Sequence, residues 1–140
     1  MVNDMRRFSF VLVLISALAC NKDEDPEKYT SYNGYWIVRT PDDLTEVTFR
    51  IGADADNLQI VDAVSLMHNG SVYNREVIDA ELAVTSSTEL EFISFRTNDF
   101  VIRLWTISVN GDFTEMQITN SSFVIDKIFR EFPMLTASRK

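Results

Sequence analysis

The sequence predicts an all-β domain, an antiparallel up-and-down meander of about eight strands. Two observations favour this class: apolar and polar residues alternate along several runs, and short polar turns separate these runs. Strands that follow one another through short turns pair with their neighbours in antiparallel fashion. The expected strands span 34–40, 44–51, 58–67, 71–85, 88–97, 100–109, 113–119 and 122–131.

The run 44–51 shows the alternation clearly, because Val47, Phe49 and Ile51 share one face and polar residues lie between them. Between the next two runs stands Asn69-Gly70, a pair that supplies the two positive φ values of a tight hairpin turn. The run 71–85 is long for a single strand. We therefore expect it to bend near Glu76.

In 88–97 the apolar positions change phase, from Leu90 and Phe92 to Ile93 and Phe95, which predicts a bulge near Phe92. A second tight hairpin is expected at Asn110-Gly111. Weaker turn signals are Ser86-Ser87, Asn98-Asp99 and Asn120-Ser121.

The run 122–131 fits two structures. Apolar residues at Ile125, Ile128, Phe129 and Phe132 have helical spacing, whereas alternate residues from Phe123 to Phe129 fit a strand. We favour the strand, because β-branched and aromatic residues dominate the run. Pro133 ends it in either case.

Closing the meander into a barrel would remove its two bare edges. Gly34-Tyr35-Trp36, at the start of the first strand, resembles the Gly-x-Trp that opens the lipocalin-like fold. The resemblance implies that Trp36 plugs the closed end of a barrel and that an arginine on the last strand packs over it, for which Arg130 is the candidate. The alternatives are a β-sandwich or a half-open barrel, with Trp36 as an ordinary core aromatic.

The N-terminus resembles a bacterial lipoprotein signal peptide. Arg6-Arg7 is followed by an apolar stretch and then by small residues directly before Cys20, the only cysteine. The apolar stretch is roughly half of the about 20 residues that a membrane-spanning helix needs. We expect removal of residues 1–19 and attachment of fatty acid, such as palmitate, to Cys20.

The residues after Cys20 suggest where the protein is displayed. Lys22, Asp23, Glu24 and Asp25 resemble the export signal of surface lipoproteins of the Bacteroidetes group. We expect a lipid-anchored protein of the outer membrane on the cell surface, with the periplasmic face as the alternative. The chain thus divides into a signal peptide (1–19), a lipidated cysteine with an acidic linker (20–33) and a β domain (34–140).

Charge excludes some partners. Removal of residues 1–19 takes away two of the 13 basic and one of the 21 acidic side chains, which leaves a formal charge of −9. Such a domain repels nucleic acid and anionic surfaces. With its single thiol lipidated, the domain forms no disulfide and depends on its apolar core.

Few residues suggest chemistry. His68, the only histidine, lies beside a hairpin turn, and a zinc site would lack further ligands. Asp79 with Glu81, and Glu89 with Glu91, have the spacing of paired carboxylates, but any i, i+2 pair on a strand has it. The segment 54–57 resembles part of a calcium loop without its glycine and glutamate. We expect no catalytic residue, metal or cofactor.

Arg103 is the polar residue to follow, since it lies among apolar neighbours. If its guanidinium pointed inward, it would need a carboxylate or a bound anion; the favoured alternative is an outward side chain.

Two functions remain. In the first, the domain is a non-catalytic accessory module with a filled core that docks on an envelope partner. In the second, a barrel mouth binds a small apolar ligand, as the lipocalin-like resemblance implies. Eight strands leave room either for side chains or for one small ligand, and the bulky expected core favours docking.

Overall fold

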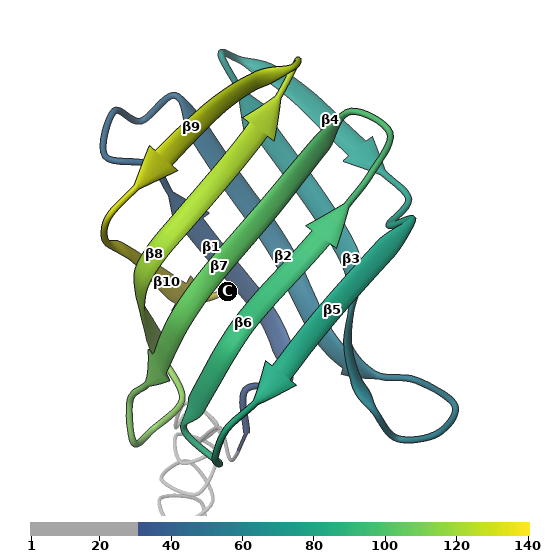
Figure 1. The fold of residues 1–140 in the computed structure, drawn as a ribbon, viewed down its shortest axis with the longest axis vertical. Coiled ribbons are helices and arrows are strands. Elements are labelled where there is room, and N and C mark those ends of the chain that lie inside the picture. The colour runs from purple at the N-terminus through teal and green to yellow at the C-terminus, as the bar shows by residue number, and fades with distance from the viewer. Residues whose placement is uncertain (1–30) are drawn as a thin grey trace, which may run out of the picture.

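The computed structural model describes residues 31–140, and these form antiparallel strands and turns without a helix, which confirms the all-β class (Figure 1). The strands are β1 (Gly34–Arg39), β2 (Thr45–Ala53), β3 (Gln59–His68), β4 (Ser71–Arg75), β5 (Asp79–Val84), β6 (Glu89–Arg96), β7 (Phe100–Val109), β8 (Glu115–Ile125), β9 (Ile128–Phe132) and β10 (Leu135–Arg139).

All ten strands belong to one sheet that curls on itself, in the order β4-β3-β2-β1-β10-β8-β7-β6-β5, with β9 also paired to β8 (Figure 1). β9 pairs with residues 121–125 of β8 and β10 with residues 115–118, so the two act as one interrupted strand. β4 and β5 also divide one run, 71–84, but they pair with different strands, β4 with β3 and β5 with β6. The first six expected strands correspond to β1 through β7, whereas the expected strands 113–119 and 122–131 differ from β8, β9 and β10 in their bounds.

The pairing of β1 with β10 brings the two ends of the described chain together, as in a barrel. On the opposite side the curl stays open. β4 pairs with β3 from Val64 to His68 and β5 pairs with β6, but no ladder joins β3 to β5. The structure is therefore a lipocalin-like open barrel, the half-open form of the expected fold.

Three local predictions are confirmed. Asn69 and Gly70 have φ values of 50° and 79° and form the two-residue turn between β3 and β4. The run 71–85 breaks after Arg75, next to Glu76. Against β5, the register of β6 shifts between Leu90 and Phe92, so Glu91 is the extra residue of the predicted bulge.

The C-terminal turns differ from prediction. Asn120 and Ser121 lie inside β8, opposite Trp105 and Leu104, so the turn expected there is wrong. The chain instead reverses at Asp126-Lys127, with φ values of 52° and 66°. The run 122–131 is therefore extended, as favoured, but this turn divides it. Pro133 ends β9, and a further strand, β10, follows it.

The hairpin at Asn110-Gly111 also differs in detail. Five residues, 110–114, connect β7 to β8, and the positive φ value belongs to Phe113 at 57° rather than to Asn110 or Gly111. The Asn110 carboxamide oxygen accepts hydrogen bonds from the backbone N–H groups of Thr114 and Glu115 at 2.9 and 3.0 Å. The asparagine thus organises a wider loop than the predicted two-residue turn.

Buried apolar side chains from both walls fill the inside of the curl. Phe49 on β2 and Phe95 on β6 come from opposite walls, and their ring centroids are 5.6 Å apart. Since side chains occupy the space between the walls, the interior at this level is a packed core. Its largest fully buried members include Trp36, Phe49, Phe95, Phe123, Ile51, Leu66, Ile93 and Leu104.

Candidate functional site

Trp36 closes the end of the barrel at which the described chain begins. Its side chain is fully buried, and its indole N–H donates a 2.8 Å hydrogen bond to the Tyr32 carbonyl. The guanidinium over its ring is that of Arg139 on β10, 4.3 Å from the ring centroid. The Arg130 assignment is therefore wrong, because β9 is not the last strand.

Gly34 makes room for this arginine. A Cβ atom at Gly34, whose φ is +130°, would lie 2.6 Å from Nη1 of Arg139. The Arg139 guanidinium donates hydrogen bonds to the carbonyls of Ser31, Asn33 and Phe113. The Gly-x-Trp sequence thus provides both the ring and the space for the cation that covers it.

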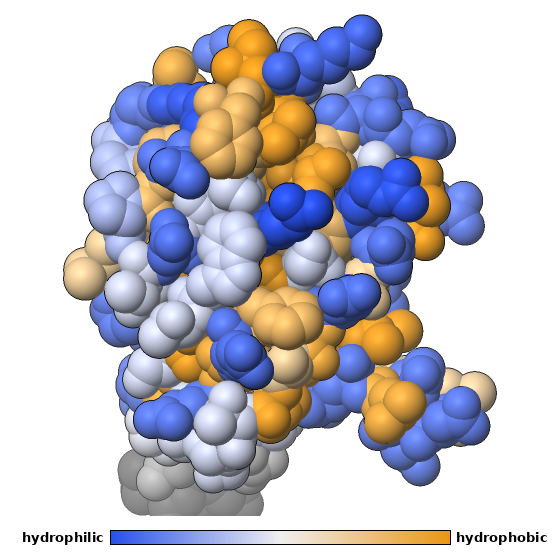
Figure 2. Space-filling view, in the orientation of Figure 1, coloured by the Kyte–Doolittle hydropathy of each residue, from blue (hydrophilic) through white to orange (hydrophobic). Residues whose placement is uncertain are grey.

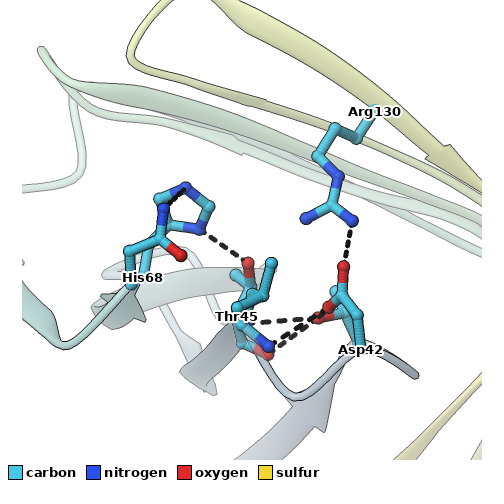
Figure 3. A network of polar contacts seen from close by, with 7 residues as sticks. Asp42, Thr45, His68 and Arg130 are labelled. Carbon is cyan, nitrogen blue, oxygen red and sulfur yellow. Dashed lines mark hydrogen bonds and ion pairs between the residues drawn. The ribbon is translucent and has the colours of Figure 1, made fainter.

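Arg130 lies at the opposite end, the mouth, to which the turns 40–44, 69–70, 97–99 and 126–127 belong. Figure 3 shows its side chain directed toward Asp42. Its guanidinium contacts Asp42 and stacks 5.0 Å from the ring centroid of Phe132. Hydrogen bonds from Thr40 and from Arg130 lower the pKa of Asp42 to about 2. The pair ties β9 to the turn between β1 and β2.

His68 also belongs to the mouth. Its Nδ1 lies 2.8 Å from the hydroxyl oxygen of Thr45, directly across the β2–β3 ladder (Figure 3). The Thr45 side chain is buried, and no carboxylate among residues 31–140 pairs with the imidazole. The carboxamide nitrogen of Asn69 lies 3.5 Å from Nε2 of His68, so we interpret these contacts as a link between the turns 40–44 and 69–70.

Two further side-chain contacts cross the mouth. Arg75 at the end of β4 forms an ion pair with Asp99 in the turn between β6 and β7. The Tyr73 hydroxyl lies 3.4 Å from Asp126, and burial, with the nearby Asp126 carboxylate as a second cause, raises the pKa of Tyr73. These contacts join the β4 hairpin to turns on the opposite wall.

The open side of the barrel carries a surface groove, here called the seam groove, between residues 59–64 of β3 and residues 74–84, which include β5. The part of the groove near the mouth has a volume of about 590 Å³. The part near the base, the end that Trp36 closes, has a volume of about 860 Å³. Ile60 and Ala80 line both parts, so the groove is continuous along the seam.

The floor of the seam groove is apolar. Val77, Ala80 and Leu82 pack against the core yet stay partly exposed, because no strand covers them on this side. Near the base, Leu58 and Val84 line the groove and are 64% and 46% exposed. Figure 2 shows the β2–β3 loop standing away from the body of the molecule, with apolar surface on the loop and on the neighbouring wall.

The rims of the seam groove are acidic. Five carboxylates line it, and Arg75, the one basic residue among the lining residues, is paired with Asp99. A bulge in β3 turns Asp62 outward, where it lies 3.6 Å from Arg50. The five are Asp54, Asp62, Glu76, Asp79 and Glu81.

Three of the other sequence-derived candidates, Asp79, Glu81 and Arg103, line a small pocket of about 170 Å³ across β5, β6 and β7. Arg103 is exposed on the outer face of β7, and no carboxylate of the described chain pairs with it, so the outward alternative is correct. Asp54 accepts hydrogen bonds from the backbone N–H groups of Asp56 and Leu58, both at 2.9 Å, as a turn residue does. Within residues 31–140 no group of three potential metal ligands comes together.

Cys20 and the export-signal residues Lys22, Asp23, Glu24 and Asp25 lie outside the described residues. Within residues 31–140 no helix has the length and apolar character needed to cross a membrane. The chain matches no protein-family model, no curated protein and no solved structure.

The seam groove was not predicted from the sequence. The one signal in the sequence was the break expected near Glu76. It indicated an interrupted strand, but it did not indicate with which neighbouring strand each half would pair. The two halves of the interrupted strand pair with different neighbours, β4 with β3 and β5 with β6. No ladder joins β3 to β5, and this leaves the seam open.

Proposed function

We propose that this chain is a lipid-anchored, non-catalytic docking module of the outer membrane, displayed on the cell surface, that binds an envelope partner through the outside of its barrel. The N-terminal sequence supports the anchor, since Cys20 directly follows the apolar stretch and precedes the acidic export-type residues. The outer wall carries an extended hollow with an apolar floor, the seam groove.

The observation that carries this proposal is the contact between Phe49 and Phe95 across the barrel. A carrier of a small apolar ligand needs an internal cavity, whereas rings from opposite walls meet in the middle of this one. The neighbouring core residues Leu66, Ile93 and Leu104 are also fully buried. The filled interior supports docking over ligand transport in the mouth.

The position of the anchor favours display of the mouth. Cys20 precedes Ser31 by eleven residues, a distance of at most about 40 Å even for a fully extended chain. Ser31 contacts Arg139 at the base, next to Trp36. A tether at this end turns the base toward the membrane and the mouth away from it.

Titration with N-phenyl-1-naphthylamine, a neutral fluorophore that brightens in apolar cavities, tests the filled interior. We expect no saturable binding by the wild-type chain. The double variant Phe49→Ala/Phe95→Ala removes both central rings and should gain a binding site, provided that circular dichroism shows it folded.

A control in the seam groove distinguishes the interior from the surface. Val84→Asp places a charge in the groove without touching the core rings. Saturable binding by the wild-type chain that persists in Val84→Asp would locate a cavity inside the barrel and contradict the docking proposal. Surface display is tested separately: protease added to intact cells should remove the domain, and full protection would place it on the periplasmic face.

A further inference from the structure

The seam groove has an unpaired strand edge on each side. Residues 59–63 of β3 pair with β2 alone, and β5 pairs with β6 alone. No backbone hydrogen bond connects the two strands, although some of their Cα atoms approach within 8 Å. Because paired strands lie about 4.8 Å apart, an added strand requires the two edges to separate further at those positions. Such edges present a row of N–H and C=O groups that an added strand can pair with.

The space beside the β5 edge is widest near the base. There the groove of about 860 Å³ separates β5 from the β2–β3 loop. Its floor includes Ile60, Leu82 and Phe92, and Leu58 and Val84 stand exposed on its two sides. An extended chain along this edge would direct alternate side chains onto the apolar floor and the others toward the rims.

The charge of the rims limits which chain fits. Five carboxylates line the groove, of which Asp62 is paired with Arg50, and the one guanidinium among the lining residues is paired with Asp99. Carboxylates at a strand edge repel acidic strands and attract basic ones. They therefore select basic partners and also disfavour aggregation through the free edge.

We propose that the seam groove binds an extended segment of a partner protein in which apolar residues alternate with lysine or arginine, added as a strand to the free edge of β5. The inference rests on the docking function proposed above and assigns it a site and a class of partner. Backbone hydrogen bonds to β5 provide affinity, the apolar floor accepts every second side chain, and Asp79 and Glu81 select the basic residues between them.

Two other occupants fit the groove less well. A second copy of this chain would bring the same acidic edge against its own, and like charges across an interface are unfavourable. The linker residues 21–30 precede Asn33, which lines the groove, but they contain four acidic and two basic side chains. Both occupants therefore carry the wrong charge for these rims.

The test uses the full-length protein in detergent and a synthetic peptide of alternating lysine and valine matched in length to β5. Matched peptides replace lysine with glutamate, or methylate the backbone nitrogens so that they cannot pair with an edge. Fluorescence anisotropy measures binding, and amide hydrogen exchange maps it. We expect the lysine peptide alone to bind and to slow exchange within residues 79–84.

Charge reversal then tests the assignment to the groove. Asp79→Lys/Glu81→Lys alters two exposed side chains and should weaken binding at least about tenfold at low salt. Glu131→Lys on β9, an exposed carboxylate outside the groove, is the matched control and should leave binding unchanged. Circular dichroism checks that both variants fold.

Four results would overturn the inference: no binding of the lysine peptide, equal binding of the glutamate or N-methylated peptide, equal effects of the groove and control variants, or slow exchange along the β5 edge before any peptide is added. The last result, combined with a dimer in sedimentation, would assign the edge to a second copy; in a monomer it would assign the edge to the linker or, if residues 59–63 are equally slow, to pairing with β3. The naphthylamine titration does not depend on any of these results, so a failure of the peptide site leaves the test of the filled interior intact.

Discussion

Replacing Trp36 by alanine tests the base of the barrel most severely. The side chain is fully buried, its indole N–H donates to the Tyr32 carbonyl at 2.8 Å, and Arg139 lies over the ring. Truncation of a buried aromatic costs about 3–5 kcal/mol. We expect a value in the upper part of this range, because the variant also loses a hydrogen bond and a cation–π contact.

Urea denaturation followed by circular dichroism measures this loss, and Trp105, the second tryptophan, remains as a fluorescent reporter. Domains of this size have unfolding free energies of about 5–15 kcal/mol, so Trp36→Ala could leave too little stability to measure. Trp36→Phe serves as the milder variant: it keeps a ring but leaves the Tyr32 carbonyl unpartnered, at a cost of about 1–3 kcal/mol.

Tyr35→Ala is the matched control. Tyr35 precedes Trp36 on β1 but faces outward, is 45% exposed and contacts Arg50 at 5.9 Å from its ring centroid. Its truncation should cost less than about 1 kcal/mol. Equal losses for Trp36→Ala and Tyr35→Ala, or no loss for either Trp36 variant, would refute the packing described here.

Three further predictions follow from the two ends of the barrel and the anchor. Arg139→Met should lower the free energy of unfolding by about 1.5–3 kcal/mol, because its guanidinium serves three carbonyls, and by clearly more than Arg130→Met in the same urea titration; the reverse order would restore Arg130 as the base residue. Asp42 has a folded-state pKa lowered from 3.8 to about 2, so its carboxylate stabilises the fold above about pH 4 and this contribution fades as the pH falls toward 2. Thermal unfolding of Asp42→Asn should therefore depend less on pH between 4 and 2 than that of the wild type, and identical slopes would exclude the effect. Cys20→Ala should move the protein out of the membrane fraction, and a mutant that stays membrane-bound would reject the lipid anchor.

Much of the fold could be predicted because its signals are local. Alternation in β2 marks its buried face, Asn69-Gly70 favours positive φ at both turn positions, and the change of phase near Phe92 indicates a bulge. Each of these features depends on residues close together in the sequence. Their physical cause is therefore present in a short window.

The C-terminal hairpin carried no such signal. Asp126 and Lys127 both have positive φ values, although neither is glycine or asparagine. The tertiary structure imposes this conformation, so no local sequence signal marks the turn. Ser121, part of the expected turn, is buried in β8, and its hydroxyl donates to the Phe132 carbonyl at 3.0 Å. Because that partner is eleven residues away, the strand was misplaced and β10 was missed.

The base and the seam groove depend on long-range pairing. Arg139 reaches Trp36 only because β10 pairs with β1 at the far end of the chain. The requirement for an arginine over the tryptophan was predicted from the lipocalin-like resemblance, but its position needed the correct last strand. The seam groove likewise depends on which neighbours β4 and β5 choose, and no local pattern specifies that choice.

Native-state hydrogen exchange of the peptide-free protein tests the central claim, that the barrel is packed inside and open along one seam. We predict that the outward amides of residues 59–63 and 79–84, those not bonded to β2 or β6, exchange rapidly, whereas amides of β7 and its ladder with β8 exchange only by global unfolding. Uniformly slow exchange across β3 and β5, equal to that of β7, would mean that the two strands are paired and would contradict the open seam.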